Sequence, residues 1–111
     1  MSAPRLKTAL VVQAALRMGD HAGRPGVVLR KGDADAGAVL VVLHGRAGVL
    51  VLAQARTPAG APAWTRATGP APVDQATADA YVARQIGRDP DLWVLEFETP
   101  DLIAPFEATL V

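Results

Sequence analysis

Two pairs of aspartates, each spaced Asp-x-Asp, are the residues of this chain best suited to chemistry. Asp33 and Asp35 lie in the segment Lys-Gly-Asp-Ala-Asp-Ala-Gly at 31–37. Alternate side chains of an extended loop point the same way, so both carboxylates could bind one Mg²⁺ or Ca²⁺. The segment is not an EF-hand loop, because the twelfth position counted from Asp33 is His44 and not Glu. The alternative is a turn, in which Asp side chains accept hydrogen bonds from backbone N–H groups.

The second pair, Asp89 and Asp91, comes just before Trp93. If the strand that follows lies beside the strand after the first pair, four carboxylates could form one cluster fit for a metal. Otherwise Asp91 caps a turn, and Trp93 is a core residue whose indole N–H has a backbone partner. Arg30 could bind a phosphate next to these acids, although no glycine-rich phosphate loop opens onto a helix. The candidate ligand-binding residues are Arg30, Asp33, Asp35, Asp89, Asp91 and Trp93, with Asp33 and Asp35 as the metal ligands.

Nucleophilic catalysis is nearly excluded by residue type. The chain has no cysteine, and its only serine is Ser2 near the terminus. A Ser-His-Asp or Cys-His arrangement is therefore not available. His21 and His44 lie at the ends of predicted elements, and no ligand-spaced motif surrounds them, which favours exposed polar residues over a metal site. The sequence predicts no catalytic residue and favours a protein that is not an enzyme.

The composition indicates one globular domain over residues 1–111. Half of the 111 residues are hydrophobic, a fifth are charged and the formal net charge is zero. A neutral chain lacks the basic surface of a nucleic-acid binder or of a polybasic membrane anchor. Gln13 and Arg17 interrupt the apolar run after Lys7, and no window approaches the ~20 apolar residues of a membrane span. We therefore expect a cytoplasmic protein with no nucleic-acid or membrane partner.

Apolar spacing predicts a helix over residues 7–22, with a strand start near 8–13 as the alternative. The face expected to be buried carries Val11, Ala14, Ala15, Met18 and Ala22.

Four strands are predicted next. The run at 38–43 is apolar at six successive positions, which indicates a central strand buried on both faces. Turn residues separate it from its neighbours, and the four strands form a plausible antiparallel meander. The predicted strands span residues 27–30, 38–43, 49–53 and 64–68.

A second helix and a last strand complete the predicted fold. Asp74 is a good N-cap for a helix over 75–87. Its apolar stripe consists of Ala78, Tyr81, Val82, Gln85 and Ile86. A strand over 92–98 would place Trp93, Leu95 and Phe97 on one face. The sequence thus predicts an α+β fold in the order α-β-β-β-β-α-β, with an antiparallel sheet of about five strands and two helices on one face.

The tail at 99–111 is too apolar for a solvated terminus. Its large apolar residues are Leu102, Ile103, Phe106, Leu110 and Val111. We expect the tail to dock on the chain's own core or to cover a partner.

Three blocks of sequence carry a resemblance to a known family. They read Leu-Val-Val-Gln-Ala-Ala-Leu-Arg at 10–17, Arg-Lys-Gly-Asp-Ala-Asp-Ala-Gly-Ala-Val at 30–39, and Asp-Ala-Tyr-Val-Ala-Arg-Gln-Ile at 79–86 running into Asp-Pro-Asp-Leu-Trp-Val at 89–94. In this order they resemble domain-of-unknown-function family 1491, small uncharacterised proteins found mainly in alphaproteobacteria. The resemblance covers residues 5–98 and implies a single-domain cytoplasmic protein with no known activity.

The apolar tail and the lack of catalytic residue types favour a function in protein–protein contact, with self-association. The alternative is a protein, or an enzyme, that binds a divalent metal or a phosphate-bearing ligand through the 33/35 and 89/91 aspartates. Under the first hypothesis no cofactor is expected; under the second it is Mg or Ca.

Overall fold

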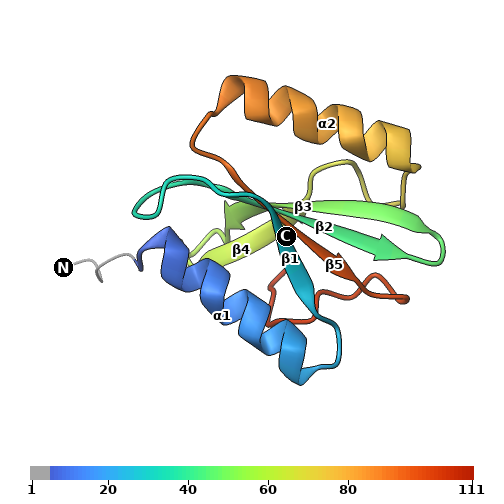
Figure 1. Cartoon of the computed structure of the whole chain (residues 1–111), viewed down its shortest axis with the longest axis horizontal. Helices are drawn as coiled ribbons and strands as arrows, with labels where there is room; N and C mark the ends of the chain where they lie inside the picture. Colours follow the sequence, from blue (N-terminus) through green and yellow to red (C-terminus); the bar gives the residue numbers. More distant parts are fainter. Residues whose placement is uncertain (1–5) are drawn as a thin grey trace.

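The computed structural model describes residues 6–111, so Ser2 lies outside the described residues. Two helices and five strands follow one another in the predicted order, which confirms the α+β prediction (Figure 1). The elements are α1 (Thr8–His21), β1 (Gly26–Arg30), β2 (Val39–Gly45), β3 (Gly48–Arg56), β4 (Pro62–Arg66), α2 (Gln75–Arg88) and β5 (Trp93–Glu98).

The five strands form one mixed sheet in the order β1-β5-β2-β3-β4. The prediction of a meander is wrong at β1, because β5 lies between β1 and β2. β5 runs antiparallel to β1 but parallel to β2, whereas β2, β3 and β4 are joined by antiparallel pairs. A parallel neighbour requires a long crossover, and the connection through α2 supplies it. Hydrophobic patterns report which faces are buried, not which strands are neighbours, so the sequence could not reveal this insertion.

β2 is the central strand, as predicted. Val39 to Leu43 are each at most 4% exposed. Alternate residues point to opposite faces of the sheet. Val41 and Leu43 join one buried cluster with Leu95 and Phe97, whereas Leu40 and Val42 join a second cluster on the other face.

The two helices cover opposite faces of the sheet, so the prediction of two helices on one face is wrong (Figure 1). α1 contributes Val12 and Ala15 to the first cluster, and α2 contributes Ala78 to the second. We call these the α1 face and the α2 face. The physical reason is the apolar character of both sides of β2: a single helical layer would leave Leu40 and Val42 in water.

The buried side of α1 differs from the predicted one. Its buried residues are Thr8, Val12, Ala15 and Gly19. Met18, expected in the core, is 42% exposed. The contact depends on small residues: a Cβ at Gly19 would lie 2.7 Å from the Phe97 ring, so glycine lets the helix approach the sheet.

The predicted features of α2 are confirmed. Asp74 caps the helix, since its Oδ1 accepts a hydrogen bond from the Thr77 N–H at 2.8 Å. Tyr81, Val82 and Ile86 pack against the α2-face cluster.

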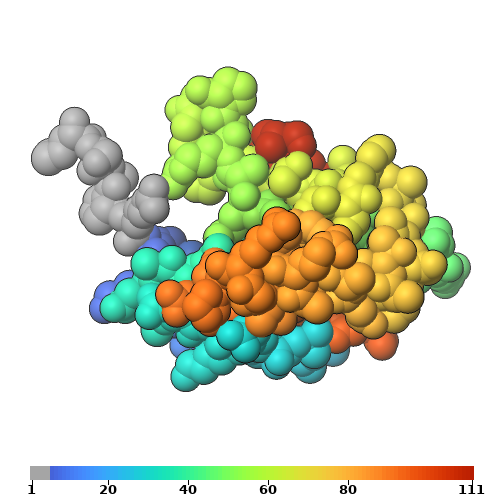
Figure 2. All heavy atoms as spheres, turned by 90° about the horizontal axis from the view of Figure 1, so that it is seen from above, coloured from blue at the N-terminus to red at the C-terminus, as the bar shows by residue number. Residues whose placement is uncertain are grey.

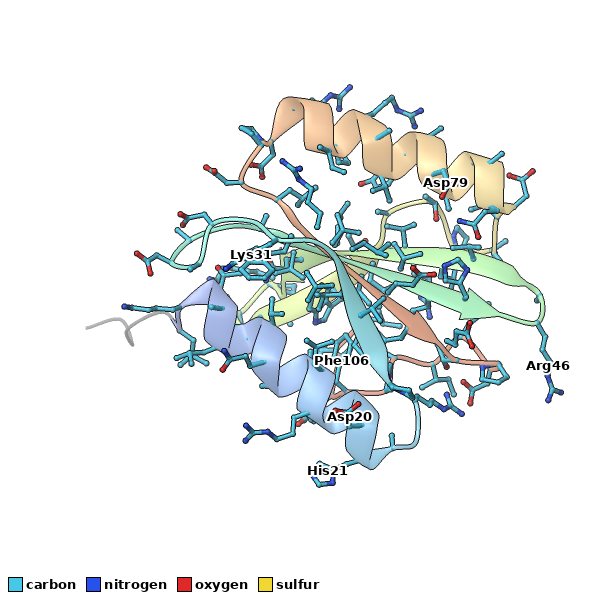
Figure 3. The ribbon with its side chains drawn as sticks, viewed as in Figure 1. Asp20, His21, Lys31, Arg46, Asp79 and Phe106 are labelled. Atoms are coloured by element: carbon cyan, nitrogen blue, oxygen red, sulfur yellow. The ribbon has the colours of Figure 1, made fainter. Side chains whose placement is uncertain are left out.

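The tail packs on the α1 face, beside α1. Leu102, Ala104 and Phe106 contact the buried cluster there, and Figure 3 shows Phe106 between α1 and the sheet. The Phe106 ring lies 5.7 Å from the rings of both Trp64 and Phe97. Further along, the Val111 N–H donates to the Trp64 carbonyl at 2.9 Å. The tail therefore covers the chain's own core and adds to the outer edge of β4.

Candidate functional site

The two aspartate turns meet in space. The Asp33 N–H donates to the Asp91 carbonyl at 2.9 Å, and the Trp93 indole donates to the Asp33 carbonyl at 2.7 Å. Figure 2 shows segment 31–37, in teal, beside the orange segment that ends α2 and leads into β5. The cause is the parallel pairing of β2 and β5, which brings the segments before these two strands to the same edge of the sheet.

Two glycines allow this close contact between main chains. A Cβ at Gly32 or at Gly37 would collide with the Asp91 carbonyl oxygen. Thr8 also joins the arrangement, because its hydroxyl donates to the Gly37 carbonyl at 2.7 Å. The Gly-Asp-x-Asp-Ala-Gly block therefore serves as a docking point for α1 and for the start of β5.

The carboxylates bind the backbone of their own turns. Asp33 Oδ2 accepts from the N–H groups of Asp35 and Ala36 at 3.2 and 2.8 Å, and Asp89 Oδ1 accepts from the Asp91 N–H at 3.0 Å. Asp35 lies 3.8 Å from the Lys7 ammonium on the surface. Within residues 6–111, no group of three or more His, Asp and Glu side chains is placed to hold a metal ion. Binding of metal by Asp33 and Asp35 stays a prediction.

Arg30 and Trp93 hold the same region together. Arg30 Nη2 donates to the Pro90 carbonyl at 2.9 Å, which ties β1 to the turn before β5. The Arg30 Nε is buried and has no hydrogen-bond partner among the described residues. Trp93 is 5% exposed and lies in the α1-face cluster. All six predicted ligand-binding residues thus make contacts within the turns or between a turn and its neighbours, and the Asp35 carboxylate also lies near the Lys7 ammonium.

A second polar cluster was not predicted. Arg24 Nη1 donates to Thr99 Oγ1 at 2.5 Å and to Asp101 Oδ1 at 2.6 Å. Thr99 is 0% exposed. The Arg24 hydrogen bonds hold the pKa of Asp101 well below its usual range, helped by the Ile103 N–H. This cluster fastens the start of the tail to the loop between α1 and β1, and nothing in the spacing of residues 24 and 101 could have indicated it.

The two histidines lie apart from these turns. His21 is exposed at the end of α1, where Figure 3 shows it beside Asp20. His44 is only partly exposed, and its Nε2 lies 2.5 Å from Glu96 Oε1 on the neighbouring strand. The prediction of an exposed residue therefore holds for His21, whereas His44 makes a cross-strand contact in the sheet.

Fold and site define a small α+β protein with a mixed five-stranded sheet, a helix on each face, and two acidic turns that interlock through their backbones. The chain belongs to the family described as "Protein of unknown function (DUF1491)", whose model matches residues 6–107. The resemblance drawn from the three sequence blocks is therefore confirmed.

Three solved structures are similar to the chain. A crystal structure of a DUF1491 family protein from Caulobacter crescentus is 32% identical, covers 96% of this chain and 100% of its own, and has a TM-score of 0.84. An NMR structure of a DUF1491 family protein from the same organism is 31% identical, with 98% and 99% coverage and a TM-score of 0.82. The solution structure of Atu0922 from A. tumefaciens is 27% identical, with 97% and 96% coverage and a TM-score of 0.79.

None of the curated proteins compared with the chain matches it. Neither helix within residues 6–111 is long and apolar enough to span a bilayer.

Proposed function

We propose that this chain works in the cytoplasm through protein–protein contact and that it self-associates through β1. The observation that carries the proposal is the open edge of the sheet. Among the strands of residues 6–111, β1 is an outer one, with β5 as its one hydrogen-bonded neighbour. Three successive apolar side chains on it are exposed: Val27 by 56%, Val28 by 41% and Leu29 by 55%. A strand edge with exposed apolar side chains is a template for pairing with another strand.

The opposite edge of the sheet is already occupied. The Trp64 N–H of β4 donates to the Thr109 carbonyl at 2.7 Å, and the Val111 N–H donates to the Trp64 carbonyl. The tail therefore takes the place that a partner strand would need at this edge. Figure 2 shows β1, in blue-cyan, at the margin of the molecule opposite the red end of the tail.

Antiparallel pairing of β1 with β1 of a second copy would bury apolar side chains on both sheet faces. Val27 lies opposite Glu96 and Val28 opposite Leu95, so the two valines point to opposite sides. Such a contact is the same on both copies and closes as a dimer.

The dimer is expected to be weak. The register shifts between Val28 and Arg30, so this bulge limits regular pairing to the first part of the strand. Burying the remaining exposed area of three apolar side chains on each copy, less the cost of association, suggests a dissociation constant of roughly 10–100 µM.

The test is the molecular mass of the full chain over about 5–500 µM by sedimentation equilibrium, a range that brackets this constant. Leu29→Glu places a charge on the open edge, and Val111→Glu is the matched control, because each side chain is 55% exposed and they lie at opposite edges of the sheet. We expect the wild type and Val111→Glu to form dimers and Leu29→Glu to stay monomeric, with equal circular dichroism spectra. A wild type that remains monomeric throughout, or a Leu29→Glu variant that dimerises equally well, contradicts the proposal.

A further inference from the structure

The tail leaves a cavity of about 160 Å³ between itself and the sheet. Leu43, Leu50 and Leu52 form its floor on β2 and β3, and Leu102, Phe106 and Leu110 of the tail form its roof. Arg66, at the end of β4, is the single charged residue in the lining. It lies opposite Leu52 in the sheet register and is exposed to solvent, so one solvent-exposed cation borders a lining whose other residues are all apolar.

The tail is fastened on both sides of the cavity, which prevents the roof from collapsing onto the floor. Before the cavity, Asp101 is held by Arg24 at 2.6 Å. After it, Thr109 and Val111 are hydrogen-bonded to Trp64. Between these two anchors the small residues Ala104 and Ala108 line the space, so their side chains do not fill it.

The roof also carries the chain's one described non-glycine residue with a left-handed backbone. Leu102 has a φ of 59°. This conformation is unfavourable for a side chain with a Cβ and persists where the surrounding structure holds it. Leu102 is held against the bare backbone of Gly45, where a Cβ would collide with the leucine side chain. Backbone strain of this kind gathers at ligand-binding positions.

We propose that this cavity binds a small amphipathic monocarboxylate, with its apolar part under the tail and its carboxylate on Arg66. The apolar lining favours a hydrocarbon occupant, and a volume of ~150 Å³ is enough for a benzene-sized group. The guanidinium of Arg66 is in no ion pair within residues 6–111, so it is free to bind a carboxylate with two parallel hydrogen bonds. A single cation matches a single negative charge. The proposal is independent of β1, which lies at the far edge of the sheet.

The test titrates the chain of residues 1–111 with straight-chain carboxylates from butanoate to octanoate and follows the leucine methyl groups by NMR. Hexanoate is expected to bind with a dissociation constant of about 1 mM. Each added methylene should tighten binding by about three- to fourfold until roughly six carbons fill the cavity. The methyl signals of Leu43, Leu50 and Leu52 should shift, whereas that of Leu29 on β1 should not.

Two variants separate the charge from the cavity. Arg66→Gln is expected to weaken hexanoate about tenfold and to leave neutral hexanol unchanged, since only the acid loses a charged hydrogen bond. Ala108→Leu occupies the cavity and is expected to weaken both ligands; a thermal melt like that of the wild type shows that it folds. Three results would each overturn the proposal. Hexanoate could bind no more tightly than butanoate, Arg66→Gln could weaken the binding of hexanoate and hexanol equally, or the largest methyl shifts could fall on Leu29.

Discussion

At position 102, glycine is expected to be better tolerated than alanine, the reverse of the usual order. Leu102 has a φ of 59°, where a residue with a Cβ is less stable by ~1–2 kcal/mol than glycine. Leu102→Ala keeps that penalty and loses the contacts of the leucine side chain with the α1-face cluster, which are worth about 2 kcal/mol for a partly buried leucine. Leu102→Gly loses the same contacts but relieves the strain.

The two variants should therefore differ by about 0.5–1 kcal/mol in favour of glycine, after allowance for the greater entropy of glycine in the unfolded chain. Urea unfolding at neutral pH measures this difference in the free energy of unfolding, with one common slope of free energy against urea concentration fitted to both variants. The matched control is Ala83→Gly, at an exposed position of α2, where glycine should cost about 1 kcal/mol. If Leu102→Gly is less stable than Leu102→Ala by the amount seen at Ala83, the left-handed backbone and the strain inferred from it are both refuted.

Three further predictions concern the turns and the start of the tail. Gly37→Ala should destabilise the protein by at least ~2 kcal/mol in urea unfolding, because the new Cβ collides with the Asp91 carbonyl oxygen. The control is Gly87→Ala, where a Cβ meets nothing within 4 Å, and it should stabilise the protein by up to ~1 kcal/mol. Asp33→Ala should lower the melting temperature, and Asp33→Asn should lower it less, because an amide oxygen can still accept the two turn hydrogen bonds. If Mg²⁺ or Ca²⁺ raises the melting temperature of the wild type and Asp33→Ala abolishes that rise, the result favours the metal site instead. The hydrogen bonds from Arg24 lower the pKa of Asp101. The ionised carboxylate therefore stabilises the folded protein fully above the ordinary carboxyl pKa, and this stabilisation is lost as the pH falls below it. The free energy of unfolding of Asp101→Asn should therefore fall less steeply than that of the wild type as the pH is lowered. If both proteins lose stability equally in acid, the ion pair with Arg24 does not contribute to stability.

Much of the element pattern could be predicted because each element has a local cause. Six apolar residues in a row mark β2, and Asp74 and Pro90 mark the two ends of α2. The arrangement of the elements has no such local signal. The buried side of α1 includes Thr8 and Gly19 beside Val12 and Ala15, and a hydrophobic pattern does not detect these two residues.

The candidate sites show the same limit. The Asp-x-Asp spacing did locate two turns that touch. The contact runs through backbone atoms, glycines and the Trp93 indole, and not through the carboxylates that drew attention. The cavity at Arg66 depends on a tail more than thirty residues away in sequence, and no spacing within β4 could indicate it.

The position of β5 sets the order in which this protein can be completed. β5 occupies the place between β1 and β2, yet it is among the last segments of the chain. During synthesis β2 can pair with β3, but β1 and the other edge of β2 stay unpaired until β5, which ends at residue 98, has left the ribosome. The contact order is correspondingly high, which slows folding. A chain stopped after α2 would expose both sides of that gap, and we expect it to be a substrate for chaperones and proteases instead of a smaller folded domain.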